Sequence, residues 1–212
     1  MYVPVAFEET RVEVMHQLIA EYPLGTMITL GPDGLVANHI PFLLDQRSGE
    51  HGTLIGHVAR NNDVWRAHDV DSEVLVVFQS VDGYITPNWY VSKRENHQVV
   101  PTWNYAVVHA YGVLVVHEDP KWLRGVVGRL TKRFEADQPT PWKMADAPPD
   151  YIAGQLDQIV GVEIPISRLT GKWKTSQNRQ PTDRHGVIAG LTERDQPGDA
   201  TMAELVRSTL PS

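Results

Sequence analysis

The stretch GYITPNWYVSKRENHQVVPTWNY, residues 83–105, carries the pattern that decides the fold. Two blocks of similar composition, each with a Thr, a Trp, a Tyr, an Asn and a Pro, flank a polar segment over residues 91–98. Aromatic residues are frequent in strands, and a polar segment between them suits a connection on the surface. The pattern therefore predicts two strands joined by a polar loop.

The same two blocks also have the composition of a binding site. Four aromatic side chains supply flat apolar surface, and four Thr and Asn side chains supply hydrogen-bonding groups: Trp89, Tyr90, Trp103 and Tyr105, with Thr86, Asn88, Thr102 and Asn104. A flat heterocycle with a polar edge needs both kinds of group. Packing within a sheet explains the aromatic residues equally well, because Trp and Tyr are favoured in strands without any ligand. Both interpretations stay open at this point.

Composition narrows the class of protein. Of the 212 residues, 42% are hydrophobic and 21% charged, which is typical of a folded chain with a core. There is no cysteine, so disulfides, thiolate metal sites and cysteine nucleophiles are excluded. The net charge of −7 argues against a large nucleic-acid footprint. No membrane segment and no signal peptide are recognised, so a cytoplasmic location is expected.

Hydrophobic spacing predicts the order of the elements. Helices are expected over residues 8–21 and 120–134, after Asn61 or Asn62 as far as Ala67, near 151–159, and near 182–194 and 199–209. Besides the aromatic blocks, strands are expected over 26–30, 35–44, 53–58, 74–78, 105–116 and 160–169. This order contains no βαβ repeat. It predicts a mainly β, α+β fold, an antiparallel barrel with helices packed outside it.

Local signals refine this prediction. The turn Gly31–Gly34 makes a hairpin of the first two strands, and Pro41 within the second places that strand at an edge or a bulge. Asp119 and Pro120 form an N-cap and first-turn pair. Without repeats or a linker, the chain is expected to be one domain, with a barrel over residues 1–174 and a helical tail over 175–212.

Several catalytic classes lack their motifs. The nine histidines form no His-x-His or HExxH pattern, so no metal site is expected. There is no Gly-x-Ser-x-Gly, no Walker loop and no Gly-x-Gly-x-x-Gly. The remaining polar candidates for a site are His39, His57, Arg60, Thr86, Asn104, Lys172, Lys174, Gln177 and Asn178.

Each of these candidates also has a structural interpretation. His39 and His57 could be hydrogen-bonded strand histidines, and Lys172 and Lys174 could be solvated along an extended segment. Residues 176–178 could simply cap or turn the chain.

Six motifs in order resemble one family, the PaiB-like FMN-binding negative transcriptional regulators. They are Met1-Tyr2-Val3-Pro4 with Phe7, His39-Ile40-Pro41-Phe42, Gly56-His57-Val58-Ala59-Arg60, Tyr84-Ile85-Thr86-Pro87 with Trp89-Tyr90, Val100-Pro101-Thr102-Trp103-Asn104-Tyr105, and Gly171-Lys172-Trp173-Lys174 with Ser176-Gln177-Asn178-Arg179. The chain departs from the family pattern at Asn62-Asp63, Gln79-Ser80 and Thr170.

The resemblance implies an FMN-binding split β-barrel of the pyridoxamine-phosphate-oxidase-like kind that forms a homodimer. Tyr84 and Trp103 join the candidates as aromatic surface for the flavin. Asn and Gln side chains can meet the flavin ring edge, and Lys or Arg can meet its phosphate. FMN is therefore the expected cofactor.

Two function classes remain. The first is a flavin-binding transcriptional regulator, and the alternative is a small FMN-dependent oxidoreductase or a haem-handling relative, in which the cofactor supplies the chemistry. No DNA-binding module is recognised. Residues 168–184 carry a net charge of +4 against −11 for the rest of the chain, so this segment is expected to meet a phosphate, of FMN or of DNA.

Overall fold

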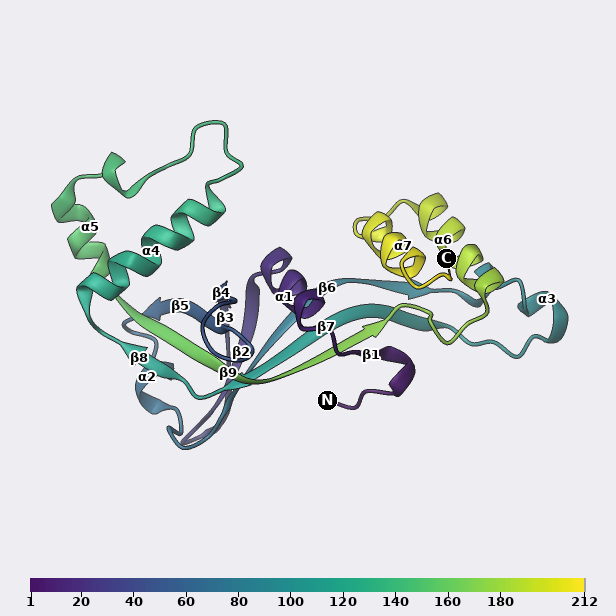
Figure 1. The fold of residues 1–212 in the computed structure, drawn as a ribbon, viewed down its shortest axis with the longest axis horizontal. Coiled ribbons are helices and arrows are strands. Elements are labelled where there is room, and N and C mark those ends of the chain that lie inside the picture. Colours follow the sequence, from purple (N-terminus) through teal and green to yellow (C-terminus); the bar gives the residue numbers. More distant parts are fainter. Residues whose placement is uncertain (212) are drawn as a thin grey trace. The chain divides into compact units, whose positions relative to one another are not determined.

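The computed structural model describes residues 1–211 and shows an α+β fold, as predicted (Figure 1). The strands are β1 (Glu8–Glu9), β2 (Leu24–Gly31), β3 (Gly34–Pro41), β4 (Leu43–Asp45), β5 (Thr53–Ala59), β6 (Val74–Ile85), β7 (Thr102–Gly112), β8 (Val115–His117) and β9 (Ile159–Lys174). The α-helices are α1 (Val12–Glu21), α2 (Val64–Ala67), α3 (Lys93–Asn96), α4 (Pro120–Phe134), α5 (Pro149–Leu156), α6 (Pro181–Arg194) and α7 (Asp199–Arg207). Three 3-10 helices complete the list: η1 (Val5–Phe7), η2 (Pro87–Trp89) and η3 (Met144–Asp146).

The strands form one sheet in the order β3-β2-β6-β7-β9-β5-β4, with β1 and β8 also pairing with β9. The recorded ladders of β1, β2, β3, β4, β5 and β8 with their neighbours are all antiparallel. β9 is the longest strand, because its first half pairs with β5 and β8 and its last residues pair with β1. The strand that carries Pro41, β3, ends the order, as the proline predicts.

The chain divides into two compact units. The first unit contains Met1–Leu18, Gln79–Val108 and the chain from Thr170 onward, and the second unit contains Ile19–Phe78 and His109–Leu169. The subdivision at residue 174 that the sequence suggests stays a prediction. Each unit is described by itself below.

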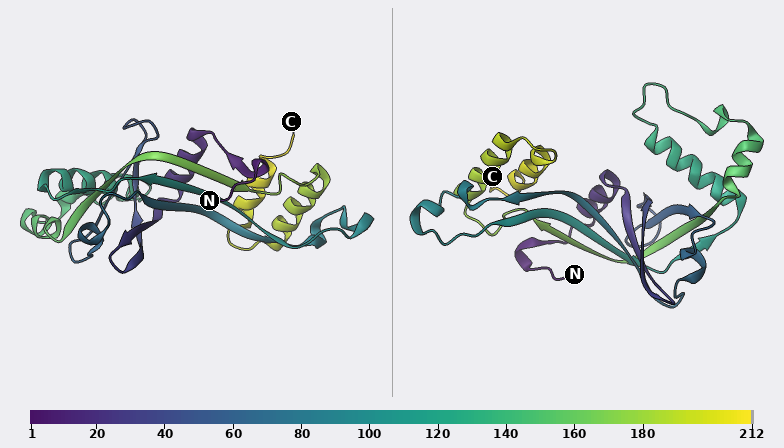
Figure 2. Two further views of the ribbon diagram at one scale, coloured as in Figure 1. Left: turned by 90° about the horizontal axis from the view of Figure 1, so that it is seen from below. Right: turned by 180° about the vertical axis from the view of Figure 1, so that it is seen from behind.

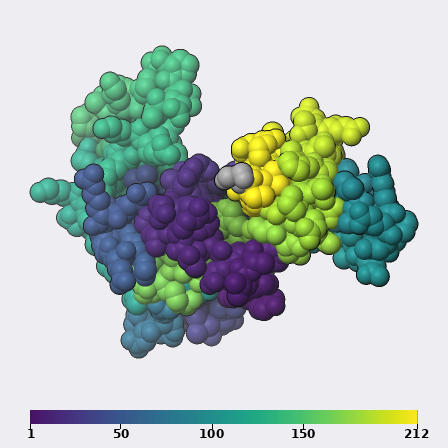
Figure 3. All heavy atoms as spheres, turned by 45° about the vertical axis from the view of Figure 1, so that its right-hand side comes forward, coloured from purple at the N-terminus to yellow at the C-terminus, as the bar shows by residue number. Residues whose placement is uncertain are grey.

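The core of the first unit lies between the end of β6, η2 and the C-terminal helices. α6 and α7 lie side by side in two views, and their atoms gather in one mass in Figure 3 (Figures 1, 2 and 3). Ile85, Tyr90, Leu191 and Met202 are buried in this core. A Cβ on Gly190 would lie only 2.3 Å from the ring of Trp89, so a larger residue cannot occupy this point of α6 without a shift.

The second unit buries the inner face of its strands and covers the outer face of β5 with α4. On the inner face the rings of Phe42 and Phe78 meet edge to face, with their centroids 6.1 Å apart. On the outer face Ile55 packs against Val126 and Leu130 of α4. Alternation along β5 produces this division, since neighbouring side chains of a strand point to opposite faces.

Several predicted boundaries are corrected by the structure. The first helix begins at Val12 rather than residue 8, because Glu8 and Glu9 form β1 and pair with Lys172 and Gly171 of β9. The expected strand 35–44 is divided into β3 and β4 at Phe42, whose amide donates to the carbonyl of Pro23 over 2.9 Å.

Other strands differ in length. The expected strand 105–116 ends at Gly112, where a Cβ would lie 2.2 Å from the carbonyl oxygen of Pro165, and β8 follows after a break. β6 continues to Ile85 and β9 to Lys174, beyond the predicted ends. The helix after Asp119 is confirmed, since the Asp119 carboxylate accepts from the Trp122 amide over 2.8 Å.

Candidate functional site

A basic cluster lies at the end of β9 in the first unit; we use this name for Lys172, Lys174 and Arg179. The ammonium group of Lys174 donates to the hydroxyl of Thr102 and to the carbonyl of Trp103, each over 2.5 Å. These two contacts fix the lysine against the start of β7. β9 therefore brings a cation to the second aromatic block of the sequence.

The other two cations lie over aromatic rings. The Lys172 nitrogen is 5.3 Å from the centroid of the Tyr105 ring and donates to the carbonyl of Tyr2 over 3.2 Å. The guanidinium of Arg179 is 4.7 Å from the centroid of the Tyr90 ring. Aromatic faces stabilise cations without neutralising them, so these contacts leave the positive charge of the cluster available.

The electrostatics of the cluster favour an anion. Burial lowers the pKa of Lys174, and the charges of Lys172 and Arg179 lower it further. Within residues 1–211, no carboxylate forms a salt bridge with any of the three cations. Glu8 is the cross-strand partner of Lys172, and this pairing also gives no ion pair. A phosphate would relieve the repulsion among the three cations, because an opposite charge favours the protonated lysine.

An exposed aromatic pair lies beside the lysine contacts. The rings of Tyr84 and Trp103 meet edge to face with their centroids 5.8 Å apart, and the two residues are 41% and 55% exposed. A Trp in a packed sheet is normally buried on one face, so packing alone does not explain this exposure. Trp103 links the aromatic pair to the basic cluster through its carbonyl, which accepts from Lys174.

Buried polar atoms without a partner in the described part of the chain stand on β7 and directly after β9. They include the side-chain oxygen of Asn104 and the hydroxyl of Thr175. Asn104 donates through its amide nitrogen to the Ser176 hydroxyl over 2.9 Å, and Ser176 has a φ of 67°. A buried unpaired acceptor is costly and is normally satisfied by a partner such as a ligand or water. Cations, aromatic faces and unpaired polar atoms together fit a flavin mononucleotide.

The structure places the other candidates of the first unit in supporting positions. The Gln177 side chain accepts from the Thr175 amide and donates to the Trp173 carbonyl, so it shapes the turn after β9. Thr86 caps η2 by accepting from the Asn88 amide over 3.3 Å. Asn178 is exposed. Eight of the predicted residues thus belong to the first unit: Tyr84, Thr86, Trp103, Asn104, Lys172, Lys174, Gln177 and Asn178.

His39, His57 and Arg60 belong to the second unit. His39 is exposed on β3, and burial lowers the pKa of His57 on β5. The Arg60 guanidinium donates to Glu118 over 2.7 Å and to the carbonyls of Asp157 and Ile159. These internal partners give Arg60 a structural task, and a role of the three residues in cofactor binding stays a prediction.

Sequence reasoning on single motifs missed part of the site. Arg179 and Thr175 are not among the candidates that the motifs predict, although both stand inside or beside the quoted motifs. The signal for Arg179 was the charge of its segment. The signal for Thr175 was absent, because an unpaired buried hydroxyl is visible only in three dimensions.

Two features are absent from the residues that the structure describes. Within residues 1–211, no group of three or more His, Asp or Glu residues could hold a metal ion. No helix of the same residues is both long enough and apolar enough to cross a membrane.

Comparison with known proteins defines the family. Residues 1–168 match the family described as "Putative FMN-binding domain", and the chain belongs to this family. The matched range includes Tyr84 to Asn104 and ends before Lys172. The predicted family resemblance is thereby confirmed, and the family match supports FMN as the cofactor.

Relatives extend the similarity through the basic cluster. The chain is 33% identical over 211 residues to "Protease synthase and sporulation protein PAI 2" of Bacillus subtilis (strain 168), covering 99% of this chain and 98% of the relative. It is 32% identical to an uncharacterized protein of Emericella nidulans, covering 98% of this chain and 96% of that one.

Solved structures share the fold at low identity. The flavocytochrome Anf3 from Azotobacter vinelandii aligns with a TM-score of 0.60 at 10% identity, covering 79% of this chain and 69% of that one. The FAD and Heme binding protein from Mycobacterium smegmatis aligns with a TM-score of 0.56 at 18% identity, covering 79% and 73%. The predicted split-barrel fold is confirmed by these neighbours.

Proposed function

We propose that this chain is an FMN-binding regulator of the PaiB kind that holds the flavin phosphate at the basic cluster of the first unit. The observation that carries the proposal is Lys174, a half-buried lysine beside two further cations and without a carboxylate partner in residues 1–211. A phosphate supplies the missing negative charge, and charge-assisted hydrogen bonds to it are stronger than neutral ones.

The ring system of the flavin belongs to the exposed aromatic pair in this proposal. Tyr84 and Trp103 offer apolar faces to the ring system. Asn104 follows Trp103 on β7 and is buried on the opposite face of the strand, so its unpaired oxygen is not assigned to the flavin ring. When bound, FMN supplies one- and two-electron redox chemistry, which the chain itself lacks. The residues described here bind and orient it.

Flavin fluorescence tests this part of the proposal. FMN titrated with the protein should lose fluorescence on binding, because stacking on an indole quenches an isoalloxazine. A Trp103→Ala variant should bind more weakly and quench less. Fluorescence that stays unchanged up to tens of micromolar protein would mean a Kd weaker than about tens of micromolar. That result would contradict a flavin site here.

The regulatory role rests on the similarity over 99% of this chain to PAI 2, which is named as a protease synthase and sporulation protein. Direct DNA contact by residues 168–184 receives little support from the structure. Arg184 donates to the carbonyl of Thr209, and Arg168 forms an ion pair with Glu73 over 3.9 Å. The cations that remain in this segment are the three of the basic cluster, which suit one phosphate better than a row of DNA phosphates.

Salt dependence separates the two kinds of phosphate. Binding to a fragment of the chain's own promoter should either be absent or have a shallow salt slope if residues 168–184 serve the flavin. A slope near −0.9 for each of several neutralised phosphates, lost on mutation of the basic cluster, would assign the segment to DNA instead.

A homodimer is part of the proposal. β3 ends the strand order, and four apolar side chains on β2 and β3 are exposed: Leu24, Leu30, Leu35 and Val36. A second copy that packed against this end of the sheet would remove apolar surface and a free strand edge from water. Light scattering should give about twice the chain mass of 23.8 kDa, and a particle of the single mass at micromolar concentration would refute the dimer.

An FMN-dependent oxidoreductase is the second candidate. The exposure of Tyr84 and Trp103 favours it, since a flavin held there would be open to a second ring. Oxidation of NADH or NADPH by the FMN-loaded protein, abolished by mutation of the basic cluster, would support this function over a purely regulatory one.

A further inference from the structure

A pocket lies in the second unit, among β5, α4, η3 and α5. Its volume is about 320 Å³, at the lower end of the range found for small-molecule sites. The walls are mainly aromatic and aliphatic: His57, Val127, Trp142, Met144, Tyr151, Ile152, Gln155, Leu156 and Ile159. None of these side chains carries a formal charge at neutral pH when the histidine is neutral, so the pocket offers no partner for a phosphate.

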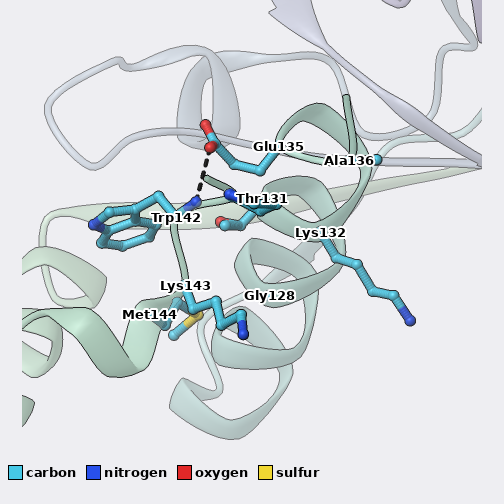
Figure 4. A pocket seen from close by; sticks show the side chains of 9 residues that line it. Gly128, Thr131, Lys132, Glu135, Ala136, Trp142, Lys143 and Met144 are labelled. Carbon is cyan, nitrogen blue, oxygen red and sulfur yellow. Dashed lines mark hydrogen bonds between the residues drawn. The ribbon is translucent and has the colours of Figure 1, made fainter. Parts of the chain in front are cut away.

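The wall that contains Trp142 and Met144 is anchored. The Trp142 amide donates to the Glu135 carboxylate over 2.9 Å (Figure 4). Within the segment that forms η3, the Lys143 amide donates to the Asp146 carboxylate over 2.8 Å. Trp142 and Met144 also line the hollow of about 470 Å³ that Figure 4 shows, so they separate two cavities. The bond from Trp142 to Glu135 ties this wall to the C-terminal end of α4, which reduces the ordering cost of binding.

His57 gives this pocket its polar character. Its Nδ1 atom is buried and has no hydrogen-bond partner in the described residues. Burial lowers the pKa of the imidazole, so the ring is neutral at pH 7 and can donate or accept one hydrogen bond. Gln155, whose amide has both a donor and an acceptor, lines the same space.

We propose that this pocket binds an uncharged, planar aromatic molecule of one or two rings that carries a single hydrogen-bonding group. Trp142 and Tyr151 provide aromatic walls, and Met144 provides a polarizable contact. His57 lines the same pocket and can form a hydrogen bond with the polar group of the ligand. The site is distinct from the basic cluster, which belongs to the first unit and suits an anion.

The hollow of Figure 4 is less suited to this ligand. Lys132, Glu135 and Lys143 line it together with apolar atoms, and it lacks a buried unpaired polar group (Figure 4). The polar group of a ligand would meet no buried unpaired partner there and would lose its hydrogen bond to water, which opposes binding. The His57 side of the wall is therefore the ligand site.

Calorimetric titration of the FMN-saturated protein with 2-naphthol tests the proposal. This probe is neutral, bicyclic and carries one hydroxyl, and 2-naphthoate is the matched anion. We expect one saturable site for 2-naphthol and at least about tenfold weaker binding of 2-naphthoate, because the anion must be desolvated among uncharged walls. FMN in excess should not displace the probe.

Two variants and a matched control localise the site. Trp142→Ala and His57→Leu should each weaken 2-naphthol binding by about tenfold through lost ring contact and a lost hydrogen bond. Phe134→Ala removes an aromatic side chain of α4 that is 42% exposed, close to the 43% of Trp142, and does not line the pocket. It should leave binding unchanged. Absence of saturable binding, displacement by FMN, or equal affinities for Trp142→Ala and Phe134→Ala would each overturn the proposal.

Discussion

Replacement of both Lys172 and Lys174 with alanine tests the phosphate site most directly. Lys174 is fixed by two hydrogen bonds of 2.5 Å, and Lys172 lies 5.3 Å from the Tyr105 ring centroid. A phosphate at the basic cluster would gain a charge-assisted contact from each lysine. The double variant removes both contacts and leaves Arg179 in place.

The size of the effect follows from the contacts. Hydrogen bonds to charged groups contribute about 1.5–3 kcal/mol each, and neighbouring groups are not additive, so the pair should contribute about 2–4 kcal/mol. This loss corresponds to an increase in the Kd for FMN of about 30-fold to about 1000-fold.

Riboflavin, which lacks the phosphate, makes the assay specific. The native protein and the double variant are each titrated with FMN and with riboflavin, and fluorescence gives the four Kd values. Their comparison separates the effect of the lysines on the phosphate from their effect on the ring system. We expect the variant to lose affinity for FMN and to keep its affinity for riboflavin, so that the two flavins bind it almost equally. The matched control is Lys121→Ala with Lys132→Ala, which removes the same charge from exposed positions of α4.

The result that refutes the reasoning is an equal loss of affinity for both flavins, because it would show a general disturbance of the fold. Unchanged FMN affinity would refute it as well and would place the phosphate elsewhere. An equal effect of the control variant would show that net charge, rather than these two lysines, attracts the flavin.

Three further predictions concern stability. Gly190→Ala should lower the free energy of unfolding by about 1–3 kcal/mol, because its Cβ would overlap the indole of Trp89. Gly125→Ala in α4, which has open space around it, should raise the free energy of unfolding by up to about 1 kcal/mol. Urea unfolding of both variants checks this, and the opposite order of stabilities would contradict it. Asp199→Ala should lower the free energy of unfolding by about 3 kcal/mol in the same assay, because it leaves the charge of Arg194 unpaired. The side chains of Asp199 and Arg194 are 4% and 22% exposed and form an ion pair over 2.5 Å. A loss below about 1 kcal/mol would show that the pair behaves as an exposed salt bridge. Burial holds the pKa of His57 in the folded chain below its usual 6.5, so between these two pKa values the unfolded chain binds more protons. The free energy of unfolding should therefore fall as the pH drops through this window. His57→Leu should reduce that fall, and parallel pH profiles of the two proteins would show that His57 does not cause it.

Local patterns in the sequence were sufficient for many elements. The helix after Asp119 was predictable because its N-cap, its first-turn proline and its apolar stripe lie within one segment. The edge position of β3 followed from Pro41, which cannot donate a ladder hydrogen bond. The lysines of β9 were found because their charge contrasts with an acidic chain.

Non-local pairing decided what the sequence left open. Glu8 and Glu9 have the composition of a helix start, and the partner strand that makes them β1 lies more than 160 residues away in β9. The lengths of β6 and β9 depend in the same way on partners that no local window contains.

For the candidate site, the sequence alone determined the family, the cofactor and the supply of cations and aromatic side chains. Only the tertiary structure separated eight candidates of the first unit from His39, His57 and Arg60 of the second. It also showed which polar atoms are satisfied: the Arg60 guanidinium has three internal partners, whereas Asn104 and Thr175 each keep one unpaired atom. The physical reason is that residue type fixes which bonds a side chain can make, while burial and the choice of partner depend on segments that fold together from distant parts of the chain.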